Sequence, residues 1–141
     1  MANYHLVILK KLYLNAILEG RKTIEMRLTK SSHHGFARVF AGDTLFIKES
    51  SGPVCATATA EAVENYRDLT PEKILEIKQQ YNHQIGGNDE YWHSKMDCRF
   101  CFLVWLRDVK SIEPVRIYKK DWRAWVVLSE KENFGLFKLQ I

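Results

Sequence analysis

The spacing of hydrophobic residues divides the first part of the chain into short elements. Residues 5–9 form an apolar run that predicts a strand, and the segment after them repeats apolar residues near helical spacing. The helical pattern is carried by Leu12, Leu14, Ile17 and Leu18. Gly20 follows, and we expect it to end the helix, because glycine adopts without strain the left-handed conformation that closes many helices.

A strict alternation of apolar and polar residues then runs through residues 23–28. The apolar positions are Ile24, Met26 and Leu28. Successive side chains of a strand point to opposite faces, so these three should face the core. Glu25 and Arg27 should then share the opposite face of the same strand.

The rest of the pattern predicts one further helix and several strands. A proline at the first turn and apolar residues on one side predict a helix over residues 71–82, and residues 83–97 are expected to form a loop. Strands, some preceded by a turn, are expected within 42–50, 51–63, 98–106, 124–129 and 133–141, and residues 110–119 should be a bent continuation of the strand at 98–106. Because strands and helices do not alternate regularly, we expect an α+β fold with a small curved sheet or barrel.

Composition narrows the class of protein without changing this picture. The chain has 141 residues, 46% hydrophobic and 27% charged, which is typical of one soluble domain over residues 1–141. No apolar run approaches the ~20 residues of a membrane span, and the first residues lack the pattern of a secretory signal. Three cysteines fit a reducing, cytoplasmic compartment. The net charge of +4 permits an anionic partner without requiring one.

Candidate chemistry gathers at the turn after the first helix. Gly20 opens a turn that carries Arg21 and Lys22, and Glu25 and Arg27 follow on the polar side of the strand. One interpretation is a solvated ion-pair face, which contributes about 0–1 kcal/mol to stability. In the other, Lys22 and Arg27 donate hydrogen bonds to a phosphate or carbonyl oxygen. Glu25 then accepts from the exocyclic amine of a base.

These residues resemble the G-x-K-x-x-E-x-R signature of the ASCH domain family, a branch of the PUA-like superfamily. The matching positions are Gly20, Lys22, Glu25 and Arg27. The resemblance extends over residues 5–66 and becomes vague beyond them. It implies a PUA-like curved β-barrel of about six strands with two or more flanking helices, and a cleft where the motif residues gather. It also implies binding of RNA, another single-stranded nucleic acid or a modified nucleoside. We expect no cofactor.

The resemblance leaves an enzymatic alternative open. Some small bacterial members are amidohydrolases that act on N4-acylated cytidine, and at least one resembles a ribonuclease. The amidohydrolases resemble this chain at Lys22 but have a threonine in place of Glu25. A metal-independent hydrolase built on this chain would therefore use Lys22 and Glu25 as catalytic residues in another way. Further candidate carboxylates for a hydrolytic site are Glu61, Glu64, Asp89 and Glu90. A module that binds another protein is a third possibility.

Aromatic and basic residues later in the chain extend the candidate site. Lys119 and Lys120 precede Trp122, and this mixture of positive charge and stacking surface suits single-stranded nucleic acid. A place in the core is an equally open interpretation for Trp122. Trp92, beside Tyr91 in the predicted loop, is a candidate to cover a cleft and contact the ligand.

No metal site is expected. Cys98 and Cys101 lack the second pair of ligands that a zinc ribbon needs, and we expect them to be structural. The neighbouring His33 and His34 have no partnered spacing. Trp125 is expected in the core. The sequence does not distinguish RNA from DNA, identify the base, or indicate an oligomeric state.

Overall fold

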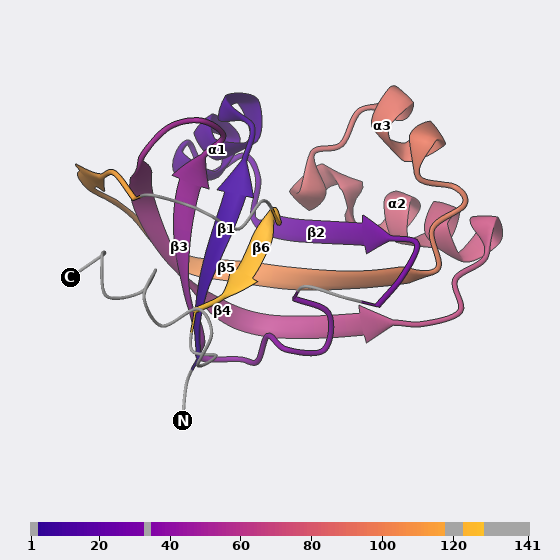
Figure 1. Cartoon of the computed structure of the whole chain (residues 1–141). Coiled ribbons are helices and arrows are strands. Elements are labelled where there is room, and N and C mark those ends of the chain that lie inside the picture. Colours follow the sequence, from indigo (N-terminus) through magenta and orange to yellow (C-terminus); the bar gives the residue numbers. More distant parts are fainter. Residues whose placement is uncertain (1–2, 33–34, 118–122, 129–141) are drawn as a thin grey trace.

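The computed structural model describes residues 3–32, 35–117 and 123–128, which form a six-stranded sheet with three helices (Figure 1). The strand order is β2-β5-β4-β3-β1-β6. The helices are α1 (Lys11–Leu18), α2 (Pro71–Ile85) and α3 (Asp89–Ser94). The strands are β1 (Tyr4–Leu9), β2 (Ile24–Thr29), β3 (Thr44–Glu49), β4 (Val54–Tyr66), β5 (Phe100–Val115) and β6 (Trp125–Val127).

The turn between α1 and β2 follows from the residues expected to make it. Gly20 directly follows Glu19, the C-cap residue of α1, and has a φ of +80°, in the left-handed region that favours glycine. β2 then pairs antiparallel with β5. The alternation places the apolar residues of β2 in a core shared with α2 and α3. Glu25 and Arg27 therefore project from the other face, as expected.

The two ends of the sheet meet, so the sheet curls into a half-barrel. β2 and β6 stand at opposite ends of the strand order. Arg27 of β2 nevertheless donates from Nη2 to the Ile8 carbonyl of β1 at 3.2 Å. Its guanidinium also lies 5.4 Å from the ring centroid of Trp125 in β6. Figure 1 shows β6 beside the start of β2. This confirms the expected curved β-barrel of the α+β class.

A buried polar network holds β6 against β1. Trp125 Nε1 donates to His5 Nδ1 at 3.1 Å, and His5 Nε2 lies 2.9 Å from Asp43 Oδ2. Because Nδ1 accepts a hydrogen bond, the imidazole proton is on Nε2, which donates to Asp43. Burial lowers the pKa of His5, which keeps the ring neutral. Trp125 is 1% exposed, which confirms its expected place in the core.

Two main cores fill the space between sheet and helices. One joins the apolar side of α1 to alanines of β4, whose small side chains allow close packing. Its members include Leu14, Ile17, Ala56, Ala58 and Ala60. The second lies between β2, β5 and the helices α2 and α3, which Figure 1 shows at the β2 end of the sheet. Its members include Ile24, Ile74, Ile77, Trp92 and Leu103.

The expectation of a loop over residues 83–97 is wrong. α2 continues to Ile85, and a short helix, α3, follows. The Asn88 side chain accepts from the Tyr91 amide at 2.7 Å and caps α3, whose first turn contains two acidic residues. The prediction failed because the same polar residue types that favour a loop, such as asparagine and aspartate, also cap short helices. The strand expected within 133–141 lies outside the described residues.

Candidate ligand-binding site

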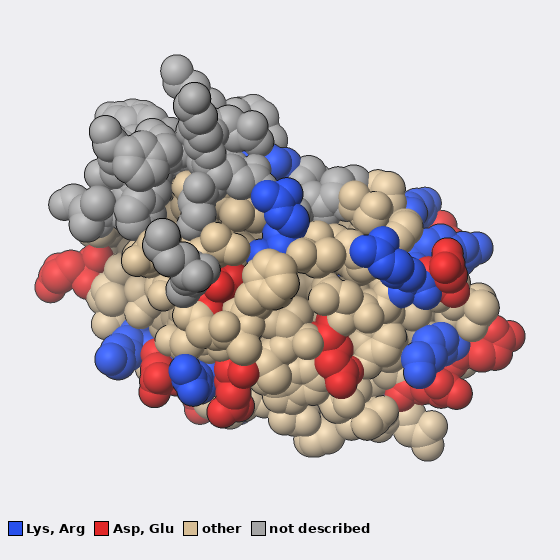
Figure 2. Space-filling model, turned by 90° about the horizontal axis from the view of Figure 1, so that it is seen from below, with Lys and Arg blue, Asp and Glu red and all other residues tan. Residues whose placement is uncertain are grey.

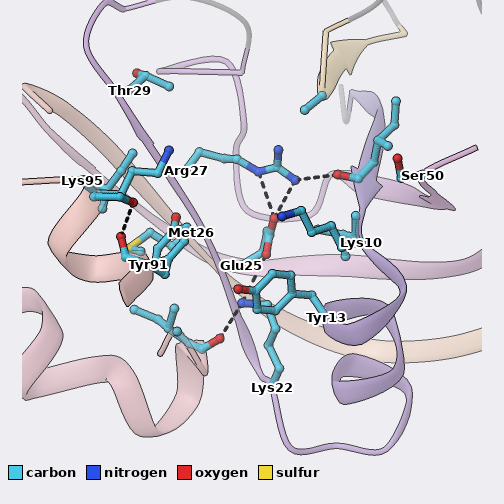
Figure 3. A pocket seen from close by; sticks show the side chains of 17 residues that line it. Lys10, Tyr13, Lys22, Glu25, Met26, Arg27, Thr29, Ser50, Tyr91 and Lys95 are labelled. Carbon is cyan, nitrogen blue, oxygen red and sulfur yellow. Dashed lines mark hydrogen bonds and ion pairs between the residues drawn. The ribbon is translucent and has the colours of Figure 1, made fainter. Parts of the chain in front are cut away.

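The side chains of Lys22, Glu25 and Arg27 converge in one pocket of about 620 Å³. Lys22 comes from the turn after α1, and the other two come from β2. Figure 3 shows Lys22 and Arg27 reaching Glu25 from opposite sides. The pocket is also lined by the end of β1, α1, the end of α2 and α3. The interpretation of these charges as a solvated strand face is therefore wrong, because Lys22 and Glu25 are each 5% exposed.

Lys22 is held by partners within the protein. Its Nζ donates to the Ile24 carbonyl at 2.8 Å and to the Ile85 carbonyl at 2.6 Å, and it lies 3.3 Å from Glu25 Oε1. Ile85 is the last residue of α2, so its carbonyl has no partner within the helix, and a cation there is favourable. A lysine ammonium has three donors, and three acceptors surround this one. Lys22 thus ties the end of α2 to Glu25.

Glu25 is a buried carboxylate with two cationic partners. Burial alone would raise its pKa, but the charges of Arg27 and Lys22 and their hydrogen bonds hold the pKa of Glu25 below the ordinary value of 4.5. Arg27 donates from Nε to Glu25 Oε2 at 2.9 Å, and Nη2 lies 2.7 Å from the same oxygen. The carboxylate is therefore ionised at neutral pH and fixed in one orientation.

Sequence reasoning missed several residues that line this pocket. Tyr13 projects from α1, and Lys10 is the residue immediately before that helix. Tyr91 and Lys95 come from α3 and the residue after it, and Ser50 follows β3. For Tyr13 alone the sequence offers a signal that it lies inside the fold, because Tyr13 stands between apolar positions of α1. The others reach the pocket through the tertiary fold, which no local pattern predicts.

Several predicted site residues lie away from the pocket wall. Gly20 shapes the preceding turn, and the exposed Arg21 pairs with Glu19 at 2.8 Å. Trp92 is 1% exposed and donates from Nε1 to Asn82 Oδ1 at 2.9 Å, which places it in the second core. The other predicted contacts, Lys119, Lys120 and Trp122, lie outside the described residues.

The carboxylates considered as further catalytic groups are likewise absent from the described lining of this pocket. Glu61 and Glu64 are exposed on β4, as are Asp89 and Glu90 in the first turn of α3. In the described ranges, no three His, Cys, Asp or Glu side chains are grouped as a metal site would require. None of the three described helices has the length and apolar composition of a membrane span.

The curled sheet and the charged cluster inside its cleft define the class of the protein. It is a PUA-like α+β fold whose pocket contains the lysine, glutamate and arginine of the predicted motif. The family model of the ASCH domain matches residues 7–140, and the chain belongs to this family, which confirms the resemblance. The fold of this family is of a kind generally associated with RNA binding.

Solved structures with the same fold come from Zymomonas mobilis. The chain matches the crystal structure of an ASCH protein from this organism with a TM-score of 0.70 and 15% identity, over 96% of this chain and 94% of that chain. A serine-to-alanine mutant of that protein matches with a TM-score of 0.71 and 16% identity, over 97% and 96%. At these identities the likeness shows the fold alone. A comparison with curated proteins finds no match.

Proposed function

We propose that the pocket around Glu25 and Arg27 binds one base of an RNA, or one modified nucleoside. A single observation carries the proposal: a buried, ionised acceptor stands beside a cationic donor whose Nη1 has no partner among the described residues, inside a pocket of about 620 Å³. Pockets of ~300–1,000 Å³ typically hold small molecules, so this volume suits one nucleoside.

Glu25 and Arg27 offer complementary hydrogen-bonding groups to a base edge. A carboxylate has about four lone-pair positions, and the ammonium of Lys22 and two nitrogens of Arg27 account for three of them. One position therefore remains for an exocyclic amine. Arg27 Nη1 has no hydrogen-bond partner among the described residues and can donate to a carbonyl or ring nitrogen. An amine beside an acceptor is common on base edges.

Two tyrosines supply aromatic surface at the same pocket. Tyr13 of α1 and Tyr91 of α3 lie on either side of Glu25 in the view of Figure 3. Burial, together with the negative charge of Glu25, raises the pKa of Tyr91, so its hydroxyl stays protonated and can donate. Stacking of a base on an aromatic side chain contributes about 1–3 kcal/mol. These two tyrosines can therefore stack on the base in the first pocket.

The charge of the visible surface also favours recognition inside a pocket. Figure 2 shows basic and acidic side chains interspersed over the described residues of one face. A protein that binds nucleic acid mainly through phosphates gathers its lysines and arginines on one surface. On this face the net charge of +4 is not gathered in that way among the described residues.

Hydrolysis of an N4-acylated cytidine or of RNA has less support. Glu25 is the one carboxylate among the described lining residues, and its lowered pKa makes it a poor proton acceptor. The Lys22 ammonium, surrounded by three acceptors, has no lone pair to act as a base. Thr23 has a hydroxyl close to Lys22 in the sequence, where a nucleophile would be needed. It does not line the pocket, and its Oγ1 accepts from Gln84 Nε2 at 3.3 Å.

A combined binding and turnover screen tests the proposal. The full chain is titrated calorimetrically with the four ribonucleosides, N4-acetylcytidine and short oligoribonucleotides, and each mixture is analysed for hydrolysis products. We expect at least one base to bind without turnover. Arg27→Lys should weaken that binding about tenfold, because lysine lacks the planar fork of donors.

The matched control is Arg21→Lys, which makes the same change at an exposed arginine outside the pocket. It should leave the affinity unchanged. Equal losses in both variants would contradict a contact between Arg27 and the ligand. Hydrolysis of N4-acetylcytidine, or of an oligoribonucleotide, would reverse the ranking of the two functions.

A further inference from the structure

A second pocket of about 460 Å³ adjoins the first. The two share Ile8, Ser50 and Ala124, so they lie on either side of a common wall. Ser50, on this wall, is labelled in Figure 3. The nucleoside proposed for the first pocket would therefore have the second pocket as its neighbour.

Cationic side chains line the second pocket. Lys48 comes from the end of β3, Arg116 follows β5, and Arg123 precedes β6. The described lining residues include no carboxylate. In the first pocket, by contrast, a carboxylate is present, and Glu25 pairs with both Lys22 and Arg27. The second pocket thus has the electrostatic character of an anion site.

Lys48 shows most directly that an anion is missing. It is 8% exposed, and its Nζ donates only to the Glu49 carbonyl, at 3.1 Å, among the described residues. No carboxylate of the described residues lies within ion-pair distance of Nζ. Burial and the charge of Arg116 lower the pKa of Lys48, and the charge of Glu49 has a smaller effect in the opposite direction. A buried ammonium with two unused donors and no counter-ion is costly.

We propose that the second pocket binds a phosphate group of the nucleotide whose base occupies the first pocket. The inference rests on the proposed function and narrows its ligand to a phosphorylated nucleotide or an RNA chain. Lys48 would direct its two unused N–H groups at phosphate oxygens, and the exposed Arg116 would supply a guanidinium fork at the mouth. The phosphate would then provide the negative charge that this pocket lacks.

A matched set of ligands tests the inference. The ribonucleoside that binds best in the screen is compared with its own 3′- and 5′-monophosphates by calorimetry at low and moderate salt. We expect one monophosphate to bind about tenfold more tightly than the nucleoside. In Lys48→Met this gain should disappear while the affinity for the nucleoside stays the same. Equal affinities for the nucleoside and both monophosphates in the wild-type protein would overturn the inference.

Further variants separate this pocket from other lysines. Lys10→Met and Lys95→Met remove cations from the wall of the first pocket, and Lys110→Met removes an exposed lysine from β5 outside both pockets. All three should keep the gain from the phosphate. Arg116→Gln, which alters an exposed side chain, should reduce the gain and provides a second test if Lys48→Met fails to fold. Loss of the gain in Lys10→Met, with Lys48→Met unaffected, would overturn the inference.

Titration with pyrophosphate alone distinguishes failure of this inference from failure of the proposed function. Binding that is lost in Lys48→Met would support the phosphate pocket even if no nucleoside binds, in which case the proposal for the first pocket fails. Nucleoside binding without any effect of a phosphate would leave the proposed function standing and overturn the phosphate pocket. Binding of neither nucleosides nor pyrophosphate would overturn both.

Discussion

Lys22 and Lys48 are both buried lysines, yet their surroundings differ in a way that decides what each can do. Lys22 is 5% exposed and has two carbonyls and a carboxylate around its ammonium. Lys48 is 8% exposed and has one carbonyl and no carboxylate partner among the described residues. The donors of Lys22 are thus engaged within the protein, whereas two donors of Lys48 have no partner among the described residues.

This difference changes the role expected from the motif. The sequence suggests that Lys22 donates to the ligand, because it stands in the recognised signature. In the structure its donors are already engaged, so we now propose that it positions Glu25 for the ligand. A buried cation therefore indicates a binding site only when the protein supplies fewer acceptors than the cation has donors.

The largest expected effect is on stability when Lys22 is replaced. Lys22→Met removes one partner of a buried ion pair and leaves the Ile85 carbonyl without its donor. We expect the free energy of unfolding to fall by about 3 kcal/mol, measured by urea denaturation. Lys110→Met, at an exposed site, should change it by less than about 0.5 kcal/mol. A similar small change in Lys22→Met would contradict the view that its contacts are structural.

The next effect concerns recognition of the base. Glu25→Gln replaces an ionised acceptor with an amide of similar shape. Affinity for bases that present an amine should fall about tenfold, and the preference among bases should change. The dependence of affinity on salt should stay constant, because no phosphate contact is removed. Uniform weakening across all bases would count against a contact between Glu25 and the base edge.

Acid should reveal the same carboxylate through stability. The pKa of Glu25 in the folded chain lies below its ordinary value of 4.5, so the ionised group stabilises the fold above that pH. This contribution is lost as the pH falls through the lower folded value. We expect the wild-type protein to lose stability in acid more steeply than Glu25→Gln, in chemical denaturation at a series of pH values. Parallel curves would show that the charges around Glu25 contribute no net stability.

The smallest expected effect has the opposite sign. Lys48→Met removes a buried charge that has no ion-pair partner among the described residues, so the unfolding free energy should stay constant or rise by about 1 kcal/mol. The pKa of Lys48 is lowered from 10.5, so the unfolded chain binds the proton more tightly, and stability should recover as the pH rises toward 10.5. The advantage of Lys48→Met over wild type should therefore shrink at alkaline pH. Marked destabilisation in Lys48→Met at neutral pH would indicate a partner that balances its charge.

Local patterns in the sequence predicted two of the elements around the first pocket, α1 and β2, but not α3. The alternation in β2 follows from two-residue periodicity, and the end of α1 at Gly20 follows from backbone freedom at glycine. Both are properties of neighbouring residues. The motif then singled out Glu25 and Arg27, the polar residues of β2 that line the first pocket, which periodicity could not do.

The second pocket could not be predicted in this way. Lys48, Arg116 and Arg123 come from three different parts of the chain, and nothing near any one of them indicates the other two. Trp92 shows the opposite problem, because a large aromatic in a polar stretch suggests a binding surface. It is instead buried by α2, and its indole N–H is satisfied by Asn82. Both outcomes depend on contacts between distant segments.

The hydrogen bond between Trp125 and His5 joins residues that are 120 positions apart. Contacts between such distant residues close a long loop of chain and are typically slow to form. The same indole ring packs against Arg27, whose guanidinium fixes Glu25. During synthesis the recognition groups would thus acquire their final arrangement only after β6 has left the ribosome. A nascent chain that has not yet added β6 would carry the signature residues but lack a finished binding surface.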